Sequence, residues 1–146
     1  MRVTYGGTKE MFCRVFFLII SFSWLFAQGQ TEGYDFYGQH LIASYYECDK
    51  EALLNLPMLE EKMLEATKAT NATVLSYTKE KFPGNGFSMV ILVSESHSSI
   101  HTYPEHGACF VDIFTCGTSC KVENFDKVLS AYLKPAKVNK EILTRD

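Results

Sequence analysis

The chain has 146 residues, of which 47% are hydrophobic and 21% charged, and its net charge is -3. This length suits one compact domain with a single core. The negative balance and the lack of a basic run in the sequence argue against a nucleic-acid surface. The number of cysteines is odd and their spacing irregular, which favours reduced thiols in a cytosolic protein over a disulfide framework. They are Cys13, Cys48, Cys109, Cys116 and Cys120.

The N-terminal segment disagrees with a cytosolic location. Residues 15–26 are almost wholly apolar, and a possible cleavage site follows at 27–29. Three basic residues precede the apolar run: Arg2, Lys9 and Arg14. These features match a secretory signal, and the run is shorter than the roughly 20 residues of a membrane span. We expect residues 1–33 to be an extension and 34–146 the domain, which is cytoplasmic unless the signal is genuine.

The first half of the domain predicts a strand followed by two helices. Residues 38–44 favour a strand that continues toward Cys48. Asp49 is a good N-cap for a short helix over 50–55, and Pro57 starts a second helical segment. The second helix carries an apolar stripe at helical spacing, which predicts core packing. Its members are Leu56, Leu59, Met63 and Ala66.

The flanking segments predict one more strand and one more helix. A strand is expected over 72–77, and prolines and glycines indicate a loop over 79–87. A loop over 117–122 leads to a helix over 123–133, and the polar tail beyond it should be loosely held. The helix turns four side chains inward: Phe125, Val128, Leu129 and Tyr132.

Residues 93–116, VSESHSSIHTYPEHGACFVDIFTC, concentrate the reactive side chains. Apolar and β-branched patterns predict strands over 89–93, 99–103 and 108–116. The polar residues 94–98 predict a tight turn, and Pro104 to Gly107 a break. Alternation puts five residues of the third strand on one face, namely Ala108, Phe110, Asp112, Phe114 and Cys116. The whole order predicts an α+β two-layer sandwich, a mostly antiparallel sheet with helices on one face.

A turn at 96–98 would leave Ser96 at a bend and His101 on the returning strand. Cys116, at the end of the next strand, would reach the same place. We therefore expect a hydroxyl, an imidazole and a thiol to converge at one end of the sheet. Such a site offers a nucleophile, a base and a proton donor.

SESHSSIHTYPE followed by DIFTCG, with GQHLIASYYECD upstream, resembles the S-adenosylmethionine decarboxylase proenzymes of bacterial and archaeal type. The resemblance covers about residues 38–133. It implies self-cleavage between Glu95 and Ser96, in which the Ser96 hydroxyl attacks the Glu95 carbonyl and His101 accepts a proton. The products are a β chain up to Glu95 and an α chain that begins with a pyruvoyl group made from Ser96, one per protomer.

The resemblance also implies the reaction. The amine of S-adenosylmethionine forms a Schiff base with the pyruvoyl group, carbon dioxide leaves, and Cys116 protonates the carbanion. The product, S-adenosylmethioninamine, is the aminopropyl donor for spermidine. Loss of carbon dioxide from an α-amino acid needs such an electron sink, and no ordinary side chain provides one.

Substrate contacts are expected at Phe82, which aligns with an aromatic residue near the adenine, at Ser88, and at Glu47 for the sulfonium or ribose. Phe87 competes with Phe82 for the aromatic role, because both adenine and a sulfonium favour an aromatic face. The family forms its sites near a subunit interface, which implies a dimer or higher assembly of cleaved protomers.

Each assignment has a plainer alternative: Ser96 as a turn serine, His101 as a structural histidine, and Cys116 as a small buried side chain. The histidines and cysteines of this stretch match no compact zinc spacing, so no metal is expected. A homologous arginine or ornithine decarboxylase would share the cleavage motif. An exported, unprocessed binding protein of the same fold is the alternative of another class.

Overall fold

The computed structural model describes residues 36–146, and the signal-like run at 15–26 lies outside them. The described residues form one compact unit. Among the described residues, no helix has the length and apolar character needed to cross a membrane.

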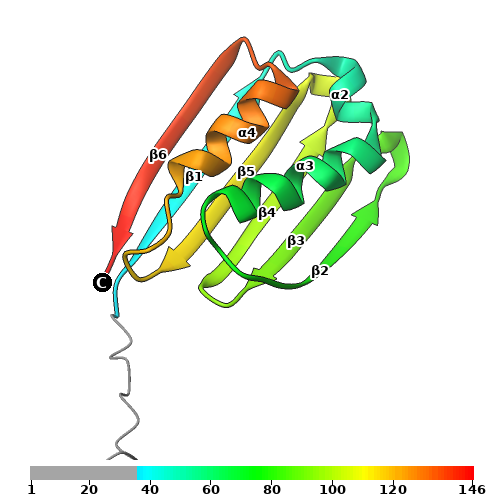
Figure 1. The fold of residues 1–146 in the computed structure, drawn as a ribbon. Coiled ribbons are helices and arrows are strands. Elements are labelled where there is room, and N and C mark those ends of the chain that lie inside the picture. Colours follow the sequence, from blue (N-terminus) through cyan, green and yellow to red (C-terminus); the bar gives the residue numbers. More distant parts are fainter. Residues whose placement is uncertain (1–35) are drawn as a thin grey trace, which may run out of the picture. The chain divides into compact units, whose positions relative to one another are not determined.

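The unit is built on a six-stranded sheet in which every neighbouring pair is antiparallel, in the order β2-β3-β4-β5-β1-β6 (Figure 1). The strands are β1 (Gly38–Tyr46), β2 (Val74–Lys81), β3 (Phe87–Val93), β4 (Ser96–Tyr103), β5 (Ala108–Cys116) and β6 (Lys137–Arg145). The strand β1 therefore lies between β5 and β6, although it comes first in the chain. The predicted α+β sandwich with an antiparallel sheet is confirmed.

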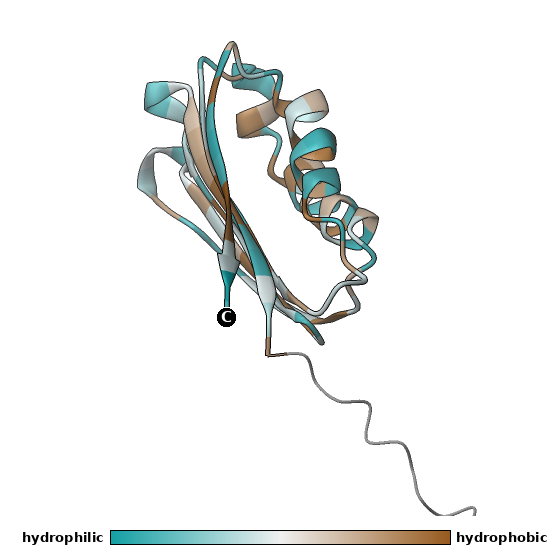
Figure 2. Ribbon diagram, turned by 90° about the vertical axis from the view of Figure 1, so that its left-hand side faces the viewer, coloured by the Kyte–Doolittle hydropathy of each residue, from teal (hydrophilic) through white to brown (hydrophobic). Residues whose placement is uncertain are grey.

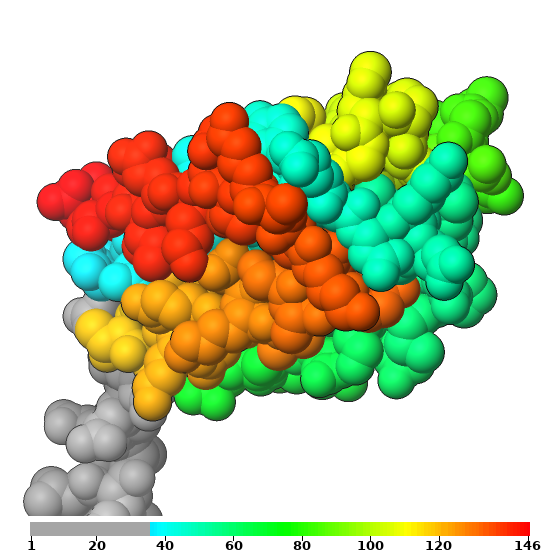
Figure 3. All heavy atoms as spheres, turned by 90° about the horizontal axis from the view of Figure 1, so that it is seen from above, coloured from blue at the N-terminus to red at the C-terminus, as the bar shows by residue number. Residues whose placement is uncertain are grey.

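Three helices cover one face of the sheet: α2 (Lys50–Leu54), α3 (Leu56–Ala69) and α4 (Glu123–Leu133) (Figure 2). As predicted, the Asp49 carboxylate caps α2 by accepting hydrogen bonds from the amides of Glu51 and Ala52. In the space-filling view α4, in orange, lies beside α3, in green (Figure 3). The buried residues of the two longer helices include the expected Leu59, Met63, Ala66, Phe125 and Leu129.

A polar network ties α4 to the sheet within this apolar core. The Tyr45 hydroxyl donates to the buried Asp126 carboxylate at 2.6 Å, and Lys140 of β6 pairs with the same carboxylate at 2.5 Å. Burial and the bond to Asp126 raise the pKa of Tyr45 well above its usual value, so it stays a neutral donor.

Within residues 36–146, no helix covers the opposite face of the sheet. Exposed apolar side chains lie along it on β1, β3, β4 and β5, in a pattern that alternates with the core residues. They are Ile42, Val90, Leu92, Tyr103 and Phe110. We call this surface the open face. By strand alternation, the side chains of His97, His101, Asp112 and Cys116 lie on it as well.

Three local predictions were wrong. The tail is not loose, because residues 137–145 form the edge strand β6 along the whole of β1. The loop expected over 79–87 is shorter, since β2 continues to Lys81 and a 3-10 turn, η1 (Pro83–Asn85), precedes β3. The turn expected over 94–98 covers only 94–95, and Ser96 is already the first residue of β4.

Candidate active site

The turn between β3 and β4 is held to the chain segment in front of β2. The Ser94 amide donates to the Thr73 carbonyl at 2.9 Å, and the Thr73 amide donates to the Glu95 carboxylate at 2.9 Å. Through these two bonds Thr73 holds both turn residues, Ser94 and Glu95, in place. The peptide bond between Glu95 and Ser96 consequently has a defined position at the end of the sheet.

The end of β5 reaches this peptide bond from the other side. The Cys116 amide donates to the Glu95 carbonyl oxygen at 2.9 Å, and the Cys116 thiol lies 3.8 Å from the Ser96 hydroxyl. The predicted meeting of Ser96 with Cys116 is confirmed. A backbone N–H on the carbonyl oxygen is also the donor that would stabilise negative charge there if the carbonyl were attacked.

Cys116 differs from the other described cysteines. Cys48, Cys109 and Cys120 are buried, whereas Cys116 is half-buried and faces the Ser96 hydroxyl. The hydrogen bond that the Cys109 thiol donates to Cys48, together with burial, raises the pKa of Cys109, and burial raises the pKa of Cys120. Of the four cysteines in residues 36–146, Cys116 is therefore the one with access to a reaction at Ser96, and the packing role expected for Cys48 and Cys109 is confirmed.

His101 does not join this group. It lies five residues beyond Ser96 on β4, a separation of about 16 Å at about 3.3 Å per residue. Alternation also turns the two side chains to opposite faces, with Ile100 and Thr102 buried and His101 exposed. The expected convergence of hydroxyl, imidazole and thiol within one chain is wrong, because β4 starts at Ser96 instead of after a bend.

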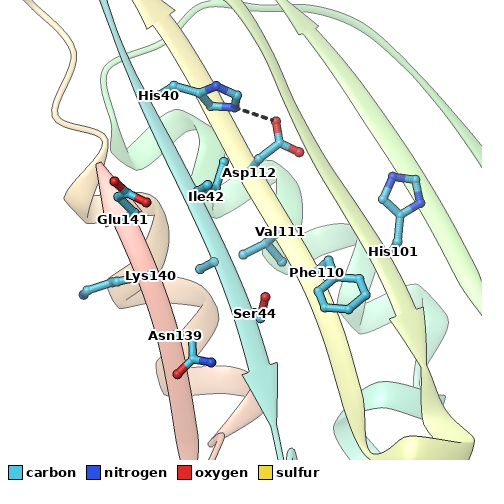
Figure 4. Close-up of a pocket in the computed structure, with 11 residues that line it drawn as sticks. His40, Ile42, Ser44, His101, Phe110, Val111, Asp112, Asn139, Lys140 and Glu141 are labelled. Carbon is cyan, nitrogen blue, oxygen red and sulfur yellow. Dashed lines mark hydrogen bonds and ion pairs between the residues drawn. The ribbon is translucent and has the colours of Figure 1, made fainter. Parts of the chain in front are cut away.

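His101 has a different partner, the candidate Ser88. The two residues lie directly opposite each other on β3 and β4, and the Ser88 hydroxyl is 2.7 Å from His101 Nδ1. His101 lines a cavity of about 630 Å³ on the open face, together with Phe110, Ser44 and Asp112 (Figure 4). In this view His101 stands apart from the pair formed by His40 and Asp112.

The two remaining candidates lie at the end of the sheet farther from the turn. Phe82 follows β2, whose last residue Lys81 pairs with Phe87, and its ring is 48% exposed. Phe87 is a core residue, 4% exposed, so of these two phenylalanines Phe82 is the one available to a ligand. Glu47 is exposed and follows β1 at this same end, next to Cys48, whose amide bonds to Gly107.

The open face also carries a cluster that the spacing of residues along the chain did not indicate. It consists of His40, His97 and Asp112. His40 Nε2 and His97 Nε2 lie 3.3 and 3.4 Å from the same Asp112 oxygen. Their residues come from β1, β4 and β5, so the register between strands brings them together. The one available signal was alternation, which put Asp112 on the face that also carries Cys116.

Comparisons with known proteins give the family. A family model described as S-adenosylmethionine decarboxylase matches residues 39–146. The chain belongs to this family. S-adenosylmethionine decarboxylase proenzymes from Thermotoga petrophila and Methanococcus aeolicus are 46% identical over 80 residues and 41% identical over 100. The matches cover 55% and 68% of this chain, and 62% and 86% of those relatives.

A solved structure, the adenosylmethionine decarboxylase from Aquifex aeolicus VF5, has the same fold with a TM-score of 0.69 and 32% identity. The likeness covers 74% of this chain and 89% of that one. The chain spans about three fifths of the length of the Thermotoga relatives, 62%.

The clamp on the turn can be tested by Glu95→Ala. This change removes the carboxylate that accepts from the Thr73 amide and leaves the peptide carbonyl in place. If the chain cuts itself at this bond, we expect cleavage to slow about tenfold, the equivalent of one modest hydrogen bond. Gel analysis of freshly refolded protein over time measures this rate. Glu105→Ala, an exposed glutamate in the turn η2 (Pro104–His106), is the matched control, and equal rates for the two variants would contradict the clamp.

Proposed function

We propose that the chain is a self-processing, pyruvoyl-dependent decarboxylase that converts S-adenosylmethionine to S-adenosylmethioninamine and carbon dioxide, for spermidine synthesis. The contact among Ser96, Cys116 and the Glu95 carbonyl carries this proposal. Membership of the S-adenosylmethionine decarboxylase family supports the substrate, and it gives no support to the arginine and ornithine alternatives.

The residues at the turn fit the formation of a pyruvoyl group. The Ser96 hydroxyl attacks the Glu95 carbonyl and converts the amide to an ester, while the Cys116 amide stabilises the charge on the carbonyl oxygen. A base then removes the Cα proton of residue 96, and the Glu95 carboxylate leaves by β-elimination. The remaining dehydroalanine takes up water and releases ammonia, which leaves the new N-terminal carbonyl.

His101 is the proposed base, and the separation within one chain means that a second copy must supply it. When Nδ1–H donates to the Ser88 hydroxyl, Nε2 keeps its lone pair for a proton. In a two-fold dimer with the open faces in contact, His101 of each copy can lie over the turn of the other. Two-fold symmetry makes each contact between the copies occur twice, so both sites are completed in the same way. The exposed apolar side chains of the open face suit such an interface.

In turnover, a pyruvoyl group supplies the electron-withdrawing carbonyl that accepts the electrons left when carbon dioxide departs. The Cys116 thiol, 3.8 Å from the position of the Ser96 oxygen, donates the proton to the substrate Cα. Phe82 offers its exposed ring to the adenine and sulfonium, and Glu47 its carboxylate to the ribose or sulfonium. Phe82 and Glu47 lie at the same end of the sheet as His101, far from the turn at Ser96, so the partner copy supplies them as well.

The first experiment compares the chain with its Ser96→Ala variant. We expect intact-mass measurement to find two fragments for the unsubstituted chain, the second with a blocked N-terminus, and one uncut chain for the variant. Carbon dioxide release should occur with S-adenosylmethionine and fail with arginine or ornithine. A single uncut chain in both preparations would favour an unprocessed binding protein instead.

The role of Cys116 is tested by Cys116→Ala, which keeps the backbone amide that bonds to Glu95 but removes the thiol. We expect cleavage to proceed and the turnover number for S-adenosylmethionine to fall by at least about 100-fold, the contribution of one proton donor. Cys120→Ala is the matched control, because Cys120 is a buried cysteine with no contact to Ser96 among those described. Unchanged turnover in Cys116→Ala would remove the thiol from the mechanism.

The shared site predicts complementation between two inactive variants. Ser96→Ala and His101→Ala should each remain uncut when expressed alone. In cells that make equal amounts of both, a mixed dimer joins an intact Ser96 to an intact His101, so up to about half of the His101→Ala chains should be cut. Intact mass separates the two variants. Cleavage of His101→Ala when expressed alone would show that this imidazole is not the base.

A further inference from the structure

We infer that His40, His97 and Asp112 bind one divalent transition-metal ion, with zinc as the type case, on the open face of the sheet. The three ligand atoms all lie within 4.8 Å of one another. Two imidazoles and one carboxylate form a donor set suited to zinc and its first-row neighbours. The proposed reaction assigns no role to these three side chains.

Two of the three separations suit a shared metal ion, and the His40–Asp112 pair is also within hydrogen-bond range. His40 Nε2 and His97 Nε2 lie 3.3 and 3.4 Å from the same Asp112 oxygen, Oδ2. Hydrogen bonds between an imidazolium and a carboxylate are shorter, about 2.7–2.9 Å. Two ligands of a tetrahedral zinc ion with bonds of about 2.0–2.1 Å lie about 3.3–3.4 Å apart, which matches both separations.

The surroundings also fit a metal site. Ser99 donates a hydrogen bond to Oδ1, the other oxygen of Asp112, and this bond orients the carboxylate so that Oδ2 faces the imidazoles. The Phe114 ring lies beside both imidazoles, with centroids 5.6 and 6.2 Å away, and limits their rotation. In a single copy the side chains of His40, Asp112 and His97 are 21%, 25% and 42% exposed, which leaves room for an ion and a water ligand before two open faces meet.

The site would join the two fragments of a cleaved chain, a consequence that rests on the proposed function. His40 lies before the proposed cut and His97 and Asp112 lie after it, and His97 is the second residue of the new fragment. A metal ion coordinated by all three would hold the start of β4 against β1 and β5 when the covalent link is lost. Metal binding itself does not need the cut.

The test uses the full-length Ser96→Ala chain, so that its outcome is independent of cleavage and decarboxylation. After treatment with a chelator, we expect the chain to bind one equivalent of Zn²⁺ in competition with a chromophoric chelator. His40→Gln, His97→Gln and Asp112→Asn should each weaken binding by at least 100-fold, and Ser99→Ala by about 10- to 100-fold. His106→Gln, an exposed histidine of the turn η2, is the matched control and should bind as before.

Cobalt replaces zinc in a second measurement, which needs no substitution in the site. Co²⁺ bound by nitrogen and oxygen gives visible d–d bands without a thiolate charge-transfer band. A thiolate band, loss of binding in Cys116→Ser, or full binding in all three ligand variants would overturn the proposal, and so would failure to bind Zn²⁺ at micromolar concentration. If the metal joins the fragments, chelation should lower the melting temperature more for the cleaved protein than for the Ser96→Ala chain.

Discussion

The hydrogen bond from the Cys116 amide to the Glu95 carbonyl is the interaction on which the site depends. Ser96 pairs with Thr115 in the ladder between β4 and β5, and this bond is the next contact beyond that pair. The peptide bond proposed for cleavage is thus positioned by the sheet itself. A slip of one residue between these strands would turn the Cys116 side chain to the other face and remove the thiol from Ser96.

Patterns with a clear burial signal were predicted well from the sequence. Residues 108–116 and 123–133 match β5 and α4, because one alternates with period two and the other repeats with helical period. The strand β6 gave no such signal, since every residue in it is exposed and it is ordered by its backbone pairing with β1 and by the Lys140–Asp126 pair. The polar start of β4 carries a turn signal in the sequence. In the structure Ser98 and Ser99 are buried by tertiary partners, Thr67 and Asp112, which a local pattern does not reveal.

The candidate site was predicted only in part. Ser96 and Cys116 meet because each lies at a strand end, a relation visible in the order of elements. The position of His101 depended on where β4 begins, and the grouping of His40 with Asp112 depended on β1 inserting between β5 and β6. Register and strand order are set by the packing of the whole sheet, so neither can be derived from one stretch of sequence.

Strand order also decides what a cut after Glu95 would do to the fold. The fragment before it holds β1, β2 and β3, and the fragment after it holds β4, β5 and β6. Because β1 lies between β5 and β6 and β3 pairs with β4, three ladders join the two fragments (Figure 1). The backbone could therefore be opened just before the start of β4 without separating the halves. A cut there would release the tight turn alone and would free the new N-terminus beside the Cys116 thiol, while the sheet keeps both in register.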